Sequence, residues 1–415
     1  MSPHGSSRSS AMPTPTSTPL GFELNDMALA FRGYNTTNLG RTRELLHLPA
    51  YGEIVRQELK RFGHICSDVT RRPADLIELV EANVEPELDR YAECVALIVA
   101  VEKAQLRLLR EVHRVEYRQA KLAWGYSLGE MMAVCCGGAF APEDLVRVPL
   151  AMADDCADLA HGAEMGVLFS RGGAISERDV TRLCVDITRH GRGTIGLSAI
   201  LSPNTYLLIG QGYTVDRFKE EMKKALPAAA HLRINEHRWP PLHTPIVRQR
   251  HVADRASLML DQLPPGKFPP KPPVFSLATA AQSYEEFQAR EVLRRWIDHP
   301  QRLWDAVVET FNSGVSAVLH IGPAPNLIPA TFARVAENVK QQTNGKTFDS
   351  YRMKAMSGMV SRPWLAALLP KRATLLRAPL LKHIILEDWL IEYAPKSQPQ
   401  TSDAAHTPEP QRGGN

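Results

Sequence analysis

Hydrophobic positions in the first part of the chain follow two different periods. Residues 27–33 form a short apolar run that ends in glycine, which predicts a buried strand, and the apolar residues of 88–118 recur three and four positions apart, which predicts a long helix. Residues 121–124 predict a second short strand. The apolar run 131–140 predicts a helix that stops at a pair of glycines. We therefore expect buried strands combined with long helices, as in an α/β protein.

The pattern changes between residues 164 and 235, where short apolar runs alternate with two stretches of helical spacing. Ser176 precedes the first of these stretches as a candidate N-cap. In order, the runs predict a strand at 166–170, a helix at 176–187, strands at 195–200 and 206–210, a helix at 215–226 and a strand at 231–235. This is the element order of the split βαβ, ferredoxin-like unit. We therefore expect residues 164–235 to form an inserted ferredoxin-like subdomain.

The remaining segments divide the chain further. Residues 1–24 begin with a stretch rich in Ser, Pro and Thr without an apolar core, which predicts a disordered leader rather than a secretory signal, and residues 395–415 have a disordered composition as well. We expect a main α/β body at 25–163 and 236–345. This body includes a proline-rich loop at 264–273 and a late strand at 316–323. A basic C-terminal helical extension is expected at 346–394.

Composition narrows the class of protein. With 44% apolar and 23% charged residues in 415, the chain is neither fibrous nor wholly disordered, and its six cysteines are too few for a disulfide scaffold. A net charge of +4 over this length does not indicate a nucleic-acid partner. No apolar run reaches the roughly 18 residues of a membrane span. We therefore expect a cytoplasmic protein with reduced, mostly buried thiols and no membrane span.

The strongest chemical signal is a G-x-S-x-G pattern, Gly125-Tyr126-Ser127-Leu128-Gly129. Small residues on both sides of the serine allow a sharp turn from strand to helix, which exposes the hydroxyl and places the next N–H beside it. A predicted strand precedes this pattern and a predicted helix follows it, as that geometry requires. Ser127 is therefore the candidate nucleophile.

A serine nucleophile needs a base within hydrogen-bond reach. Among fourteen histidines, His243 follows the predicted subdomain directly, where the chain returns to the main body and a loop residue could meet Ser127. His243 is therefore the candidate base.

These motifs resemble those of the malonyl-CoA:acyl-carrier-protein transacylase family. GYSLGE at 125–130 resembles its nucleophile region and LHTPIV at 242–247 its histidine motif. Three further segments resemble family motifs: AFRGYNTTNLG at 30–40, SPNTYLLIG at 202–210 and VLHIGPAPNL at 318–327. The five segments occur in the family's order and extend from residue 27 to about residue 340.

The resemblance implies a fold, an activity and partners. The fold is an α/β-hydrolase-like body with an inserted ferredoxin-like subdomain. The activity is acyl transfer from acyl-CoA, a substrate rather than a bound cofactor, to an acyl carrier protein in fatty-acid or polyketide biosynthesis. No cofactor is held tightly and no metal is used. Ser127 would carry the acyl group, His243 would be the base, and the N–H groups of Leu128 and Tyr34 would form the oxyanion hole.

Departures from the family pattern concern the substrate pocket. Where the family has an arginine that binds the malonyl carboxylate, an ungapped count gives Met152. Tyr126 replaces a histidine, and Tyr34 replaces a glutamine. In the family a backbone carbonyl orients the histidine, and here Trp296 or Ile297 would supply it. A pocket lined by Tyr126, Met152 and Trp296 favours a monocarboxylic acyl group over malonyl.

Two alternative functions remain open at this point. An acyl hydrolase that clears acyl groups from carrier proteins would need the same serine and histidine, and it would fit the absence of the arginine equally well. A non-catalytic binding partner with this fold would fit the altered pocket, although the retained Ser127 and His243 argue against it.

Other patterns are weaker. Residues 191–196 fit G-x-G-x-x-G, but a strand rather than a helix is expected after them, which argues against a nucleotide site. His231, His237 and His243 lack the spacing and companions of a metal site. Residues 352–386 hold seven Lys or Arg and no acidic residue. We interpret this stretch as amphipathic helices packed on the body; a docking surface for an acidic carrier protein and a membrane-surface helix are the alternatives.

Overall fold

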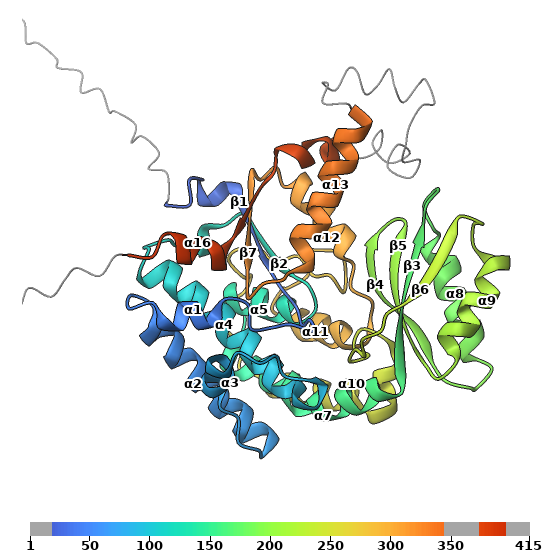
Figure 1. The fold of residues 1–415 in the computed structure, drawn as a ribbon, viewed down its shortest axis with the longest axis horizontal. Coiled ribbons are helices and arrows are strands. Elements are labelled where there is room, and N and C mark those ends of the chain that lie inside the picture. Colours follow the sequence, from blue (N-terminus) through green and yellow to red (C-terminus); the bar gives the residue numbers. More distant parts are fainter. Residues whose placement is uncertain (1–18, 344–372, 396–415) are drawn as a thin grey trace, which may run out of the picture.

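The structure is a computed structural model that describes residues 19–343 and 373–395 (Figure 1). In this part of the chain two sheets lie apart, each with its own helices (Figure 1). No helix in these residues is both long enough and apolar enough to cross a membrane. All six cysteines are buried and free, in agreement with the prediction of reduced thiols.

The first sheet is parallel. It consists of β1 (Met27–Phe31), β2 (Leu122–Gly125), β7 (Ala317–Ile321) and β8 (Lys382–Ile385), in the order β2-β1-β7-β8. Every residue of β1, β2 and β7 is buried, as expected for a parallel sheet covered on both faces. The side chains of β1 alternate between two hydrophobic cores.

Helices cover the two faces of this sheet. Met27, Leu29 and Phe31 point into the larger core, formed with most of the helices, whereas Ala28 and Ala30 point towards α12 and α13. Helices that contribute to the larger core are α1 (Thr42–His47), α2 (Gly52–Thr70), α3 (Leu76–Ala82), α4 (Tyr91–Glu111), α5 (Leu128–Cys136), α6 (Pro142–Leu145), α7 (Arg147–His161), α10 (Val252–Gln262), α11 (Ala289–Asp298) and α16 (Leu386–Glu392). Helices α12 (Leu303–Asn312) and α13 (Leu327–Thr343) cover the opposite face (Figure 1).

The second sheet is antiparallel and lies between residues 163 and 234. Its strands are β3 (Ala163–Ser170), β4 (Ile195–Ser202), β5 (Thr205–Gln211) and β6 (Ala230–Ile234), in the order β4-β5-β3-β6. Helices α8 (Glu177–Thr188) and α9 (Thr214–Ala225) connect them and pack on one face (Figure 1). The predicted order of six elements is confirmed, and Ser176 Oγ caps α8 by accepting from the N–H of Asp179 at 3.3 Å.

Several boundaries differ from the predicted ones. The long helix expected to reach residue 118 ends as α4 at Glu111, and Arg114 after it has a φ of 58°, which a helix does not allow. The expected disordered leader extends too far, because Leu20 and Leu24 are buried in the larger core. Leu24 begins a short 3₁₀ turn, Leu24–Asp26, which leads directly into β1.

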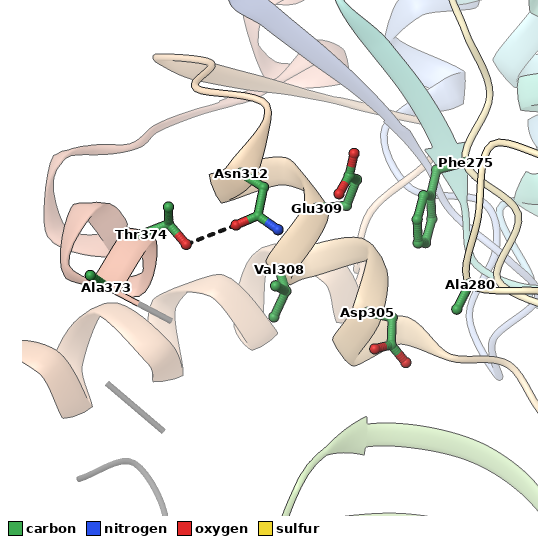
Figure 2. Close-up of a pocket in the computed structure, with 8 residues that line it drawn as sticks. All are labelled: Phe275, Ala280, Asp305, Val308, Glu309, Asn312, Ala373 and Thr374. Carbon is green, nitrogen blue, oxygen red and sulfur yellow. Dashed lines mark hydrogen bonds between the residues drawn. The ribbon is translucent and has the colours of Figure 1, made fainter. Parts of the chain in front are cut away.

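The described part of the C-terminal segment differs from a purely helical extension. After the 3₁₀ helix η5 (Ala373–Leu380), β8 pairs in parallel with β7 and so completes the main sheet. Leu375, Ala378 and Leu381 are buried in the core beside α12 and α13, which agrees with packing on the body. Thr374 Oγ1 also donates to Asn312 Oδ1 at 2.9 Å (Figure 2). Residues 344–372, with most of the basic stretch, lie outside the described residues.

Candidate active site

Ser127 lies on a sharp turn between β2 and α5. Its φ of 53° and ψ of −122° are unusual for a residue with a side chain, and the backbone there is strained. A Cβ on Gly125 would overlap the backbone of Gly129, and a Cβ on Gly129 would overlap the carbonyl oxygen of Phe31. Gly125 is therefore required for the turn itself and Gly129 for the packing of the turn against β1, as expected of a nucleophile elbow.

His243 meets Ser127 as the sequence predicted. Its Nε2 lies 2.8 Å from Ser127 Oγ, and its Nδ1 lies 2.6 Å from the carbonyl oxygen of Trp296. The backbone N–H of His243 donates to the carbonyl of Ile297 at 2.7 Å, so the two residues considered in the sequence hold the histidine at two different atoms. Because a carbonyl can only accept, Nδ1 carries the proton and Nε2 presents its lone pair to Ser127.

Burial sets the protonation state of His243, which is 4% exposed. Loss of solvation lowers its pKa from 6.5 to about 4, and the hydrogen bond to the Trp296 carbonyl opposes only part of that shift. The imidazole is therefore neutral at neutral pH and able to accept the proton of the Ser127 hydroxyl.

Two backbone N–H groups are available near the serine. Leu128 is the first residue of α5, where a helix leaves N–H groups without partners. The segment that holds Tyr34 passes directly over the turn, since a Cβ on Gly33 would lie 2.9 Å from Ser127 Cβ. In the described part of the chain no acceptor is recorded for the N–H of Leu128 or of Tyr34. The two donors predicted for an oxyanion hole therefore belong to segments that meet at Ser127.

Two side chains hold the backbone of Ser127. The Ser127 N–H donates to Gln301 Oε1 at 3.1 Å, and the indole Nε1 of Trp296 donates to the Ser127 carbonyl at 2.8 Å. Gln301 is fully buried and was missed in the sequence, where a glutamine after a proline resembles an ordinary surface residue. Trp296 was predicted for the substrate pocket, but its polar atoms instead bind Ser127 and His243.

A cavity of about 460 Å³ opens beside Ser127 and His243. Apolar side chains of the second sheet line one side, among them Met165, Leu207 and Ile209. On another side the Tyr34 ring stands edge-on to Tyr91 and Trp239, with ring centroids 4.9 Å and 6.0 Å apart respectively. Tyr126 also lines the cavity, as predicted, together with Asn35, Asn235, Asn326 and Arg334. The cavity thus has an apolar wall and a few polar groups.

Met152 lies behind this cavity. It lines a small adjoining void with Val148, Cys156, Leu242 and Trp296, and Tyr91 borders both spaces. Arg147 instead forms a surface ion pair with Asp68 at 2.7 Å.

The two arginines that line the cavity in the described residues are differently placed. Arg32 is buried and donates to Asn38 Oδ1 at 2.8 Å and to the Thr37 carbonyl at 3.1 Å, whereas Arg334 is exposed on α13. The guanidinium of Arg32 is therefore already occupied by the loop that contains it.

Metal-binding groups and a second hollow bear on which cavity is the candidate site. Within residues 19–343 and 373–395, no group of three or more His, Cys, Asp or Glu side chains is placed to hold a metal ion. A second hollow of about 460 Å³ lies along α12, lined by Phe275, Asp305, Glu309 and Thr374 among others (Figure 2). It contains neither a histidine nor a nucleophile held by a base, so the cavity at Ser127 is the candidate active site.

Comparisons with known proteins identify the fold. No family model and no curated protein sequence matches this chain. Among solved structures, an acyl carrier protein S-malonyltransferase from Vibrio cholerae has a TM-score of 0.58 and 19% identity, over 72% of this chain and 90% of that chain. The acyltransferase domain from the second module of the salinomycin polyketide synthase has a TM-score of 0.58 and 18% identity, over 84% of this chain and 77% of that domain.

A third similar structure is a malonyl-transacylase, PlMCAT, in complex with the type II polyketide synthase acyl-carrier protein AntF. It has a TM-score of 0.58 and 22% identity, over 74% of this chain and 92% of that chain. At these identities the likeness establishes a shared architecture. The chain therefore has the mixed α/β fold of the malonyl-CoA:acyl-carrier-protein transacylases and of polyketide synthase acyltransferase domains.

Proposed function

We propose that the protein is an S-acyltransferase that moves an acyl group from coenzyme A to an acyl carrier protein through an acyl-Ser127 intermediate. The observation that carries this proposal is the 2.8 Å contact between Ser127 Oγ and His243 Nε2, on a strained strand-to-helix turn within a transacylase fold. The α/β-hydrolase-like body would supply the elbow, and the ferredoxin-like insertion the apolar wall of the cavity. A carrier-protein partner is supported by the complex known for one protein of this fold.

The reaction would proceed in two halves through the same atoms. His243 Nε2 takes the proton of Ser127 Oγ as the oxygen attacks the thioester carbon, and the N–H groups of Leu128 and Tyr34 stabilise the oxyanion. When the carbon–sulfur bond breaks, the imidazolium gives its proton to the departing thiolate. In the second half His243 takes a proton from the phosphopantetheine thiol of the carrier protein, and the thiol sulfur attacks the ester. Return of that proton to Ser127 Oγ restores the enzyme.

The acyl group that we propose is monocarboxylic. Met152 stands at the position counted for a carboxylate-binding arginine and lies among apolar side chains, and Arg147 is paired with Asp68 on the surface. A malonyl carboxylate directed towards Met152 would lose its hydration without gaining a bidentate partner. An acetyl group or a longer alkanoyl group has no charged end, so its burial beside Met152 carries no such loss of hydration.

The experiment is mass spectrometry of the purified protein after incubation with malonyl-, acetyl- and longer acyl-CoAs, with and without a carrier protein. We expect acyl-Ser127 with monocarboxylic donors, acyl-carrier product when the carrier is added, and no adduct on Ser127→Ala. Efficient malonyl labelling would refute the assigned acyl class. Free acid in place of acyl-carrier would identify a hydrolase, and a protein that never forms an acyl-serine would be a non-catalytic binding partner.

A further inference from the structure

Two loops border the candidate active site from neighbouring strands of the main sheet. The β1–α1 loop, residues 32–41, follows β1, and the β7–α13 loop, residues 322–326, follows β7. The first residue of the β1–α1 loop lies beside the end of β7, where the N–H of Arg32 donates to the carbonyl of Ile321 at 3.1 Å. Both loops line the cavity, the first through Tyr34 and its neighbours. The shape of the site therefore depends on what fixes these loops.

One carboxylate binds both loops. Glu387, in the first turn of α16, is fully buried. Its Oε1 accepts the N–H of Arg41 at 2.7 Å, and its Oε2 accepts the N–H of Ala324 at 3.0 Å. The carboxylate lies close against the backbone, since a Cβ on Gly40 would be 2.6 Å from Oε1. Each oxygen of Glu387 thus holds a different loop.

Hydrogen bonds inside the β1–α1 loop connect this attachment to the oxyanion donor. Asn38 Oδ1 accepts the N–H of Asn35 at 3.0 Å, and Asn38 Nδ2 donates to the Asn35 carbonyl at 2.6 Å. Glu85 accepts the N–H groups of Asn38 and Leu39 at 2.7 Å and 3.0 Å. The loop is therefore held at its far end by Glu387 and in its middle by Glu85, and Tyr34 directly precedes the braced Asn35.

A second cross-connection joins the same two loops. Besides its bonds within the β1–α1 loop, Arg32 donates to the carbonyl of Pro323 in the β7–α13 loop. Arg32 and Glu387 approach Pro323 and Ala324 from the two sides of this short segment, one as a donor and the other as an acceptor. Of these two side chains, Glu387 is the one that comes from outside the loops.

We propose that Glu387 is a positioning residue for acyl transfer, which holds the N–H of Tyr34 and the β7–α13 wall of the cavity in place around the acyl-serine. This inference rests on the proposed role of Ser127 and adds a role for α16, which lies outside the five sequence segments that resemble transacylase motifs. Glu387 touches neither substrate nor Ser127 and acts only through the two loops.

The test compares Glu387→Gln with the wild type in single-turnover acylation of Ser127 by acetyl-CoA. The amide nitrogen of glutamine cannot accept, so one of the two loop N–H groups loses its partner. A displaced oxyanion donor slows the chemical step by about tenfold to a hundredfold. The acetyl-CoA concentration at half-saturation should change by a smaller factor than the rate, because the oxyanion donor acts mainly on the transition state.

Glu392→Gln is the matched control, since Glu392 is an exposed glutamate in the same helix, and it should acylate at the wild-type rate. An unchanged rate in Glu387→Gln overturns the proposal. So does a loss that is fully explained by a smaller folded fraction in thermal unfolding. If Glu387→Gln does not fold, Glu387→Asp keeps a carboxylate that is too short to reach both loops. It should show a smaller but measurable loss of rate, and a wild-type rate would again overturn the proposal.

A second substrate separates this inference from the proposed function. p-Nitrophenyl acetate needs the nucleophile and the oxyanion donors but no recognition of coenzyme A. If the wild type reacts with this ester and with no acyl-CoA, the proposed function fails while the comparison with Glu387→Gln still stands. If the wild type reacts with neither, Ser127 is not a nucleophile and both proposals fail.

Discussion

At the scale of single residues, the environment of His243 determines the pH range in which this histidine can act as a base. The imidazole is buried, its Nδ1–H is bound by the Trp296 carbonyl, and no carboxylate is in contact with it among the described residues. A carboxylate partner would raise the pKa of the histidine strongly, whereas the Trp296 carbonyl raises it only enough to oppose part of the effect of burial. The arrangement therefore provides a base that stays neutral well into the acidic range.

The pH dependence of acylation follows from this pKa. A base acts only when unprotonated, so activity is lost as the pH falls through the pKa of His243, which burial lowers to about 4. We expect the single-turnover rate with acetyl-CoA to be level from pH 7 down to about pH 5 and to fall with a midpoint near 4. His243→Gln should lower the rate by about a hundredfold or more between pH 5 and pH 7, and the difference from the wild type should shrink below pH 4. A midpoint near 6.5, the ordinary value, would contradict the buried geometry.

Met152 provides a prediction about the acyl group. In Met152→Arg the guanidinium enters an apolar surrounding, and an uncompensated buried charge lowers the free energy of unfolding by about 3 to 5 kcal/mol. Malonyl-CoA would supply the missing partner, so it should raise the melting temperature of this variant more than acetyl-CoA does. Met152→Leu, which keeps the site apolar, should respond equally to the two ligands. Equal responses of Met152→Arg would show that residue 152 does not face the acyl group.

At the scale of elements, the turn between β2 and α5 depends on glycines. In Gly129→Ala the new methyl group would overlap the carbonyl oxygen of Phe31 in β1, and the rigid backbone on both sides cannot move apart freely. We expect a loss of about 1 to 3 kcal/mol or more in the free energy of unfolding, measured in urea. Gly173→Ala is the control, because no atom lies within 4 Å of the position of its new methyl group. It should change stability by less than about 0.5 kcal/mol.

Sequence patterns predicted the elements whose signal is local. The strand, serine turn and helix around residues 122–136 follow from an apolar run and two glycines, and the six elements between 163 and 234 follow from their periodicity. Strand β8 could not be found in this way. Lys382–Ile385 is a short, half-exposed run in a basic stretch, and only its pairing with β7, far away in the sequence, makes it a strand.

In the candidate site, too, the residues that depend on contacts between distant segments could not be predicted. Ser127 and His243 were predicted because a motif marks each of them, whereas Gln301 and Glu387 carry no motif. Their roles come from burial and from backbone groups that only the fold brings near: the N–H of Ser127 for Gln301, and those of Arg41 and Ala324 for Glu387. Met152 was expected in the pocket itself and lies just behind it, since a count along the sequence does not specify depth.

At the scale of the whole molecule, the described part of the C-terminal segment belongs to the body that contains the main sheet. Removing everything from residue 373 deletes β8 and α16, which exposes the edge of β7 and leaves Arg41 and Ala324 without Glu387. We expect this truncated protein to lose cooperative unfolding. A second variant replaces only residues 345–371 by a glycine-serine linker, with cooperative unfolding and acylation by acetyl-CoA measured on the same samples.

The second variant also tests the basic stretch as a docking surface for an acidic carrier protein. A slower transfer to the carrier with unchanged acylation of Ser127 would support docking, because complementary charge mainly speeds encounter. Unchanged rates of both Ser127 acylation and transfer to the carrier protein would exclude docking by the replaced residues.

The order of strands in the main sheet also has a consequence for synthesis of the protein. Strand β1, the first strand of the described chain, lies inside the sheet, and β8, the last strand of the described chain, closes one edge. A nascent chain that has produced Ser127, His243 and every strand but β8 would still present an open β7 edge and an unanchored pair of loops. The main sheet and its two loops would thus be complete only after β8 and α16 have been synthesised, and a ribosome that stalls before them would leave an aggregation-prone intermediate.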